Sequence, residues 1–264
     1  MKNNLVKFDL SENILYLTLN NSEHQNTLSE EMIDELDYHF QKASNNPDVK
    51  VIILSSTGSV FCAGHNLKEL HSKRSQSDKG ESYYKRIFEK CSALMMNIVN
   101  NNKPVIASID GVATAAGCQL VASCDLAYAT ESSKFATPGV NIGLFCSTPM
   151  VALSRAVNKK ASMEMLLTGD LIQSNKAKEI GLINDIFTSQ ELNTKVLNIA
   201  KKIATKSKHT LKVGKDAFYK QKEMKIEDAY KYASSVMVDN ILNDDAEEGI
   251  EAFIEKRKPI WKNK

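Results

Sequence analysis

The chain has 264 residues, of which 42% are hydrophobic and 25% are charged, and its formal net charge is +2. These values are ordinary for a globular protein, and the length is sufficient to bury a sizeable core within one large domain. The near-neutral charge argues against nucleic acid or an acidic membrane as a partner, and no apolar run reaches the roughly 18 residues that a membrane-spanning helix needs.

The N-terminal segment and the cysteines bear on the cellular compartment. The segment MKNNLVKFDL has one lysine near its start and no apolar block behind it, so we expect no secretory signal. An odd number of cysteines without a CxxC pair argues against a disulfide framework, a zinc ribbon and a redox motif. We therefore expect reduced thiols and a cytoplasmic location. The cysteines are scattered through apolar surroundings, at Cys62, Cys91, Cys118, Cys124 and Cys146.

The first half of the chain alternates between predicted strands and helices. Residues 6–10 and 14–19 predict a short hairpin, and Ser29 precedes a predicted helix over 30–43 whose first turn is acidic. The continuous apolar run at 49–56 is typical of a buried parallel strand. This alternation predicts a layered α/β core with right-handed crossovers. The later predictions are a loop at 57–67, a helix at 81–99, a strand at 105–109, a turn at 111–117, a short helix at 118–124 and a strand at 125–130.

After Thr148 the apolar spacing becomes mainly helical, with Gly169 and Gly181 as predicted helix C-caps. We expect an α/β core over residues 1–200 and a helical region over 201–264 that packs within and between subunits.

Two segments rich in small residues follow predicted strands. They are FCAGHN at 61–66 and GVATAAGCQ at 111–119, and ligands of open α/β sheets bind beyond the carboxyl ends of strands. Small residues leave backbone N–H groups accessible, and the second segment opens a helix whose first N–H groups lack helical partners. Two N–H groups aimed at one oxygen form an oxyanion hole, with about 2.7–4 kcal/mol of transition-state stabilisation per donor. Alternatively, the small residues only permit tight packing.

Longer motifs resemble the enoyl-CoA hydratase/isomerase (crotonase) superfamily over about residues 5–261. They are FCAGHNLKEL, KPVIASIDGVATAAGCQLVASCDLAYATESSKFATPGVNIGLF, MEMLLTGDLIQSNKAKEIGLIND and EGIEAFIEKRKP. The resemblance implies an α/β fold of the ClpP/crotonase type, a spiral of ββα units with a C-terminal helical trimerisation region. It also implies an enzyme of the lyase class that assembles as a homotrimer or a dimer of trimers. Acyl-CoA is its substrate or ligand, and no further cofactor is expected.

The resemblance also implies roles for individual residues. The backbone amides of Ala63 and Ala116 would hold the thioester carbonyl, and Ala116 stands where many relatives have glycine. Phe253 and Lys256 would contact the nucleotide of a neighbouring subunit. The expected CoA-binding residues are Ala63, Gly64, His65 and Asn66, together with His24 and Gln25, which occupy positions where relatives often carry basic side chains.

Two glutamates that serve proton transfer in family hydratases are replaced here. Gln119 and Gly139 occupy their positions; glutamine does not exchange a proton at neutral pH, and glycine has no side chain. A general acid or base contributes roughly 10²–10⁴-fold to a rate, so we expect most ordinary hydratase activity to be lost. The alternative is a non-catalytic acyl-CoA-binding or regulatory protein.

Other groups near the motifs remain candidates for chemistry. His65 follows the first loop and titrates near neutrality, although it could instead only pack against the CoA arm. Cys146 and Ser147 could face the pocket, but we expect Cys146 to be a small buried residue. Asp125 is expected to be a structural hydrogen-bond acceptor. We predict no metal site, because His65 and His71 lack supporting carboxylate or cysteine ligands.

Overall fold

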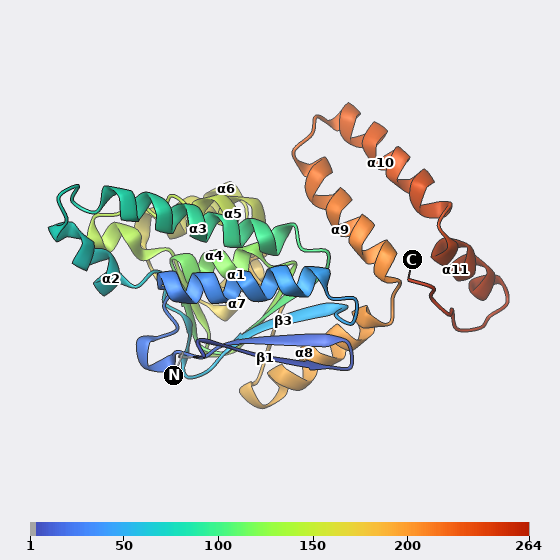
Figure 1. The fold of residues 1–264 in the computed structure, drawn as a ribbon, viewed down its shortest axis with the longest axis horizontal. Coiled ribbons are helices and arrows are strands. Elements are labelled where there is room, and N and C mark those ends of the chain that lie inside the picture. The colour runs from blue at the N-terminus through green and yellow to red at the C-terminus, as the bar shows by residue number, and fades with distance from the viewer. Residues whose placement is uncertain (1–3, 264) are drawn as a thin grey trace.

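The computed structural model describes residues 4–263 and shows an α/β core from which the C-terminal helices α9, α10 and α11 project (Figure 1). Over the described residues, the strands form a six-stranded sheet and a separate four-stranded sheet. Within the same residues, no helix is both long and apolar enough to cross a membrane.

The larger sheet has the strand order β1-β2-β3-β5-β7-β10. Its first two strands pair antiparallel, as the predicted hairpin requires, and the remaining neighbours pair parallel. The strands predicted in the first half of the chain are thereby confirmed. The strand bounds are β1 Val6–Ser11, β2 Ile14–Leu19, β3 Val51–Ser56, β5 Val105–Ile109, β7 Leu126–Thr130 and β10 Asp185–Phe187.

The smaller sheet has the order β4-β6-β8-β9, and two of its strands lie in segments expected to be irregular. The predicted loop at 57–67 contains β4, and the predicted turn at 111–117 contains β6, so both predictions were wrong at these residues. Strands of two or three residues are too short to show an alternating apolar pattern. Their bounds are β4 Val60–Cys62, β6 Val112–Thr114, β8 Lys134–Ala136 and β9 Ile172–Gln173.

Helices cover both faces of the larger sheet. Alternate residues of β3 show this: Ile52 and Leu54 belong to the apolar cluster that includes α1 and α3, whereas Ile53 belongs to the cluster with α8. Burial on both faces explains why this strand is a continuous apolar run. The core helices are α1 Glu30–Asn45, α2 Leu67–Ser72, α3 Glu81–Val99, α4 Ala116–Ser123, α5 Pro149–Ala156, α6 Lys159–Thr168, α7 Ser174–Glu179 and α8 Ser189–Ala204, with 3₁₀ turns at Ser22–His24, Lys73–Ser75 and Pro138–Ile142.

The projecting helices α9 Lys208–Lys222, α10 Ile226–Ile241 and α11 Asp244–Ile254 form an arm on one side of the core (Figure 1). The predicted domain boundary at residue 200 falls inside α8, which packs on the sheet, and the arm begins at Lys208. The division itself stays a prediction. Large apolar side chains are exposed along the arm, among them Ile226, Tyr230, Leu242 and Phe253.

A buried polar cluster fastens the arm to the core. The Asp125 carboxylate accepts hydrogen bonds from Lys215 Nζ at 2.7 Å, from the Tyr219 hydroxyl at 2.9 Å and from the Val105 amide at 2.7 Å. The expected structural role of Asp125 is therefore confirmed. Burial lowers the pKa of Lys215, partly offset by Asp125, and burial raises the pKa of Tyr219. Removal of Asp125 would leave a buried ammonium group without its counter-ion.

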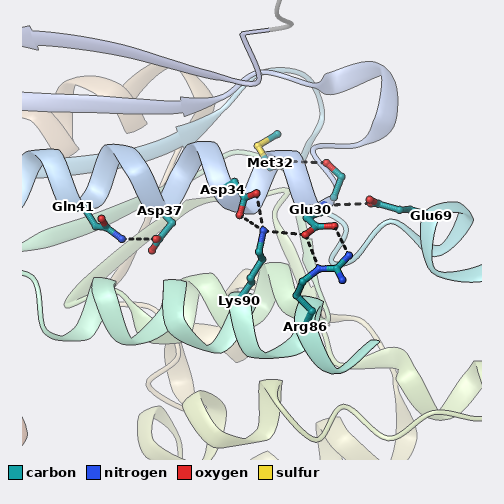
Figure 2. A network of polar contacts seen from close by, with 9 residues as sticks. Glu30, Met32, Asp34, Asp37, Gln41, Glu69, Arg86 and Lys90 are labelled. Carbon is teal, nitrogen blue, oxygen red and sulfur yellow. Dashed lines mark hydrogen bonds and ion pairs between the residues drawn. The ribbon is translucent and has the colours of Figure 1, made fainter. Parts of the chain in front are cut away.

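Charged side chains link α1 to α3 on the outer surface of the core (Figure 2). Glu30 pairs with Arg86 at 3.0 Å and with Lys90 at 2.9 Å, and Lys90 also pairs with Asp34 at 2.8 Å. Glu69 on α2 accepts a hydrogen bond from the Glu30 amide at 3.3 Å. The hydrogen bond from Arg86 to Glu30 is the main reason why the pKa of Glu30 is lowered to about 2.

This lowered pKa makes the contribution of Glu30 to the stability of the fold depend on pH. A carboxylate with a lowered pKa stabilises the fold above its ordinary pKa of 4.5, and the contribution disappears as the pH falls from there towards about 2. We expect Glu30→Gln to lower the free energy of unfolding at pH 7 by about 1 kcal/mol or less, because the pair is partly exposed. The difference from the parent protein should shrink below pH 4 in urea unfolding. Glu31→Gln, an exposed site in the same helical turn, is the control, and an equal loss at both sites would contradict this role.

Candidate active site

The first and second small-residue loops lie side by side because of the smaller sheet. Strands β4 and β6 pair parallel, so the loop after Cys62 and the loop after Thr114 leave neighbouring strands at the same edge. The Thr114 hydroxyl donates a hydrogen bond to the Ala63 carbonyl at 3.2 Å and joins the two loops directly. The predicted juxtaposition is correct, but short strands that the sequence did not reveal produce it.

The two loops approach so closely that glycine is required on both sides. A Cβ atom at Gly64, whose φ is +88°, would lie 2.8 Å from the Ala115 Cβ and 3.2 Å from the Ala116 amide nitrogen. A Cβ atom at Gly117 would lie 2.0 Å from the Cys62 carbonyl oxygen. Contacts this short are incompatible with any side chain, so the two backbones are packed directly against each other.

The structure contradicts the role expected for the Ala63 amide. Its N–H donates to the Gln25 carbonyl at 3.1 Å, and its own carbonyl accepts the Thr114 hydroxyl. Ala63 therefore holds the loop in place and has no free donor for a ligand. Sequence spacing located the correct loop but could not show which of its amides is already bonded.

The His65 amide is the available donor of this loop. Leu28 and His65 form a parallel β-bridge in which the Leu28 amide donates to the Gly64 carbonyl at 2.8 Å. In a parallel bridge the flanking residues make the bonds, so the N–H of His65 itself points away from Leu28. It donates to none of residues 4–263, and Gly64 beside it lies against the Ala116 amide.

The Ala116 amide is the corresponding donor of the second loop. Ala116 is the first residue of α4, so its N–H lacks a helical partner and lies at the positive end of the helix. The preceding residue, Ala115, has φ 51° and ψ −119°, a conformation that favours glycine. Hydrogen bonds hold it there, because its amide donates to Ala136 at 2.9 Å and its carbonyl accepts from Gln119 at 3.0 Å.

The His65 imidazole lies between the segment before α1 and helix α3. Its Nδ1 is 3.3 Å from the Leu28 carbonyl, and its ring packs edge-on against Phe88 at 5.2 Å. A carbonyl can only accept, so Nδ1 carries the hydrogen and Nε2 is left with a lone pair. Burial lowers the pKa of His65, which favours this neutral form, and Nε2 is buried without a partner among the described residues.

Gln119 lies on α4, one turn beyond Ala116, and only 4% of its surface is exposed. Its Oε1 atom is buried and has no hydrogen-bond partner within residues 4–263. An unpartnered buried amide oxygen is costly, which makes this position a candidate contact for a ligand.

Gly139 lies in a place that cannot hold a glutamate side chain. A Cβ atom there would lie 2.8 Å from the Leu144 carbonyl oxygen and 2.9 Å from the Cys146 sulfur, and the Gly139 amide donates to that sulfur at 3.3 Å. Cys146 is buried as expected, whereas Ser147 is exposed and donates to the Phe145 carbonyl. The Leu144–Cys146 segment therefore fills the space that a glutamate side chain at position 139 would need.

The thiols of this region are poor nucleophiles. Burial raises the pKa of Cys62 and of Cys118 to about 12, and it also raises the pKa of Cys146. Thiolates, not thiols, attack electrophiles, so these side chains are structural. In the described part of the chain, no group of three or more His, Cys, Asp and Glu side chains is arranged to hold a metal ion.

The residues expected to bind CoA separate into two places. Gln25 lies beside the first loop, because its carbonyl accepts a hydrogen bond from the Ala63 amide. His24 Nδ1 lies 3.1 Å from the Asn21 side chain. Asn66 caps α2 by accepting from the Lys68 and Glu69 amides. Phe253 and Lys256 lie at the α11 end of the arm, remote from α2 within one chain (Figure 1). The structure of one chain thus does not bring the arm residues to the loops.

Known proteins are similar to this chain in sequence and in fold. The sequence model of the enoyl-CoA hydratase/isomerase family matches residues 9–264. The chain is 47% identical, over 95% of its length and 82% of the relative, to enoyl-CoA hydratase domain-containing protein 3, mitochondrial, of Mus musculus; the Homo sapiens protein of that name is 46% identical over 95% of this chain and 81% of its own.

Solved structures agree with these relatives. The crystal structure of the human domain-containing protein 3 superposes with a TM-score of 0.93 at 45% identity, over 97% of this chain and all of that one (100%). An enoyl-CoA hydratase from Bacillus anthracis superposes with a TM-score of 0.91 at 25% identity, over 98% and 100%. The predicted fold class and family resemblance are confirmed, including the similarity to the domain-containing protein 3 type.

The expected cytoplasmic location is wrong. Relatives from Mus musculus, Rattus norvegicus, Homo sapiens, Xenopus laevis and Danio rerio are all named as mitochondrial proteins. Reduced cysteines distinguish reducing from oxidising compartments, and this criterion does not separate the cytosol from other reducing compartments.

The closed space at Gly139 can be tested by adding one methyl group. We expect Gly139→Ala to lower the free energy of unfolding by about 1–3 kcal/mol, because the new Cβ would overlap a backbone carbonyl. Gly214→Ala on α9 is the matched control, because a Cβ there meets nothing within 4 Å, and it should stabilise by about 0.5–1 kcal/mol. Urea unfolding measures both. A Gly139→Ala protein as stable as the parent would show that the Leu144–Cys146 segment is not packed as described.

Proposed function

Because the chain belongs to the enoyl-CoA hydratase/isomerase family, we propose that it binds acyl-CoA thioesters through the backbone amides of His65 and Ala116. The observation that carries the proposal is the direct packing of Gly64 against the Ala116 amide, which brings two unbonded N–H groups to one place. Rigid donors aimed at one oxygen stabilise negative charge on a thioester carbonyl. The proposed binding needs no cofactor beyond the acyl-CoA.

The same site gives little support for hydration by two carboxylates. Gln119 has no acidic proton, and the space at Gly139 is occupied by the Leu144 carbonyl and Cys146. His65, whose amide is one of the two proposed donors, is titratable, and the lone pair at its Nε2 is buried. These observations favour a second candidate function as well, in which the protein holds acyl-CoA without turning it over.

We further propose that the arm mediates self-association, as a homotrimer or a dimer of trimers. Exposed apolar side chains on α10 and α11, such as Ile226 at 73% and Phe253 at 84%, support this, because a large exposed apolar patch marks an interface. Phe253 and Lys256 would then reach the ligand of a neighbouring subunit, which accounts for their distance from the loops of their own chain.

A pair of matched ligands tests the oxyanion proposal. Butyryl-CoA and its S-butyl thioether analogue differ only in the carbonyl oxygen, so we expect the thioester to bind at least about tenfold more tightly, the equivalent of one to two hydrogen bonds. Isothermal titration measures the affinities, and the infrared carbonyl band of bound ¹³C-labelled thioester should move to lower frequency than that of the free ligand. Equal affinities with an unshifted band would contradict a carbonyl held by amides.

Turnover of crotonyl-CoA tests the loss of proton transfer. We expect the parent protein to hydrate it well below the roughly 1–10³ per second of typical enzymes, measured by the loss of the enoyl ultraviolet band. Gln119→Glu should raise the rate by at most about 10²–10⁴-fold, since it restores one of two carboxylates, whereas Gln119→Leu should not raise it. Hydration by the parent protein at ordinary enzyme rates would overturn the view that the acids matter here.

A further inference from the structure

Strand β1 is an open edge of the larger sheet. Within residues 4–263 it pairs with β2 alone, and every residue of the strand after Val6 is exposed. The Asn20 amide donates to the Leu5 carbonyl at 2.7 Å, so alternate residues from Leu5 onwards bond to β2. The residues between them direct their backbone groups away from the sheet. Phe8 and Leu10 therefore present N–H and C=O groups along the open edge.

The beginning of this edge is held in place by helix α1. The Glu35 carboxylate accepts hydrogen bonds from the Leu5 amide at 3.1 Å and from the Val6 amide at 3.2 Å. The Val6 donor is therefore occupied, whereas its carbonyl still faces the edge. A strand fixed in this way is a ready template for one further strand.

The face of β1 that lies towards α1 carries exposed apolar side chains. The Phe8 ring lies 4.8 Å from that of His39 on α1, and Leu10 projects to the same face because side chains alternate along a strand. Phe8 is 62% exposed and Leu10 is 39% exposed, and Tyr38, whose ring lies 5.5 Å from that of His39, is 51% exposed. Apolar side chains at an open edge favour coverage by a partner.

The opposite face of β1 carries two charges that identify the partner. Lys7 and Asp9 flank Phe8, both are exposed, and neither forms an ion pair with any residue that the structure describes. A second copy of the strand, antiparallel and related by a two-fold axis at Phe8, places Lys7 of each copy opposite Asp9 of the other. An axis at Asp9 would instead place two carboxylates opposite each other, which is unfavourable.

We propose that two copies of this chain pair through β1, antiparallel across a two-fold axis at Phe8, so that their larger sheets continue into one another. In this register the Phe8 N–H of each copy donates to the Phe8 carbonyl of the other, and the Leu10 N–H donates to the Val6 carbonyl. The open donors of both edges are then satisfied, and each contact contains two Lys7–Asp9 pairs.

This contact is separate from the proposed self-association through the arm. Strand β1 lies at the lower margin of the core, whereas α10 lies at the upper end of the arm (Figure 1). One six-residue edge makes a small and weak contact. Trimers assembled through the arm would carry three such edges, and three contacts that form together bind far more tightly than one. The inference thus selects the dimer of trimers, and only this number rests on the proposed function.

Reversal of the edge charges in the full chain tests this contact by native mass spectrometry. We expect the parent protein to contain six chains and Asp9→Lys to contain three, with a dissociation constant of the two-fold contact raised at least about tenfold, because lysines then lie opposite each other. Lys7→Asp should have the same effect. The double variant Lys7→Asp/Asp9→Lys restores both pairs and should return the parent subunit number. Glu89→Lys, at an exposed site on α3, is the control with the same charge change.

Two further measurements identify the register and the strand. An equimolar mixture of Asp9→Lys and Lys7→Asp chains should form hybrid assemblies, because each strand is then opposite one of the other charge. Hydrogen exchange at the Phe8 and Leu10 amides should be slow in the parent protein and fast in Asp9→Lys, since only pairing protects these donors.

The outcomes separate this inference from the proposal for the arm. A parent protein of three chains, or single variants whose loss the double variant does not repair, would overturn the pairing of β1 and leave the arm proposal intact. If the arm forms no trimer, sedimentation should still show a concentration-dependent dimer that Asp9→Lys abolishes. A chain that stays monomeric at every concentration would overturn both proposals.

Discussion

The direct contact of two backbones is the constraint on which the site depends. Gly117 lies so close to the Cys62 carbonyl that an added Cβ would be 2.0 Å from the oxygen, and Gly64 lies against the Ala116 amide in the same way. Strands β4 and β6 create this contact, because their parallel pairing aligns the ends of both loops. The larger sheet and its helices supply the burial that holds the smaller sheet in place. The small side chains of the two loops matter chiefly because they leave the backbone amides of His65 and Ala116 accessible to a ligand.

Backbone strain at Ala115 follows from the same contact. A non-glycine residue at φ 51° and ψ −119° costs of order 1–3 kcal/mol, and such strain persists only where the surroundings over-determine it. Here the bonds from Ala115 to Ala136 and from Gln119 to Ala115 do so. The turn they enforce starts α4 abruptly, so that the first amide of the helix faces the first loop. The strain is therefore part of how the donor is positioned.

Much of the fold could be predicted from the sequence, and much less of the site. The hairpin at 6–19 and the helices at 30–43 and 81–99 follow from apolar periodicity and caps, which are local signals. The smaller sheet has no such signal, because its strands have two or three residues. The donor of the first loop has no local signal either: the family resemblance implies Ala63, whereas the folded chain leaves the His65 amide unbonded. The bond from Ala63 to Gln25 closes a contact between segments far apart in sequence, and only the folded chain shows that this amide is taken.

At Gln119 and Gly139, the loss of the two expected carboxylates goes beyond two substitutions, because packing also excludes one of them. At Gln119 the side chain is similar in shape to glutamate, and a single change would return the acid. At Gly139 the Leu144 carbonyl and the Cys146 sulfur lie within 3 Å of any added Cβ, so a carboxylate requires the whole Leu144–Cys146 segment to move. The proposed site thus keeps two backbone N–H donors for a carbonyl, whereas packing excludes the second acid. Such an arrangement suits the proposed binding of a thioester, and the buried lone pair at His65 Nε2 is a candidate base for any chemistry at this site.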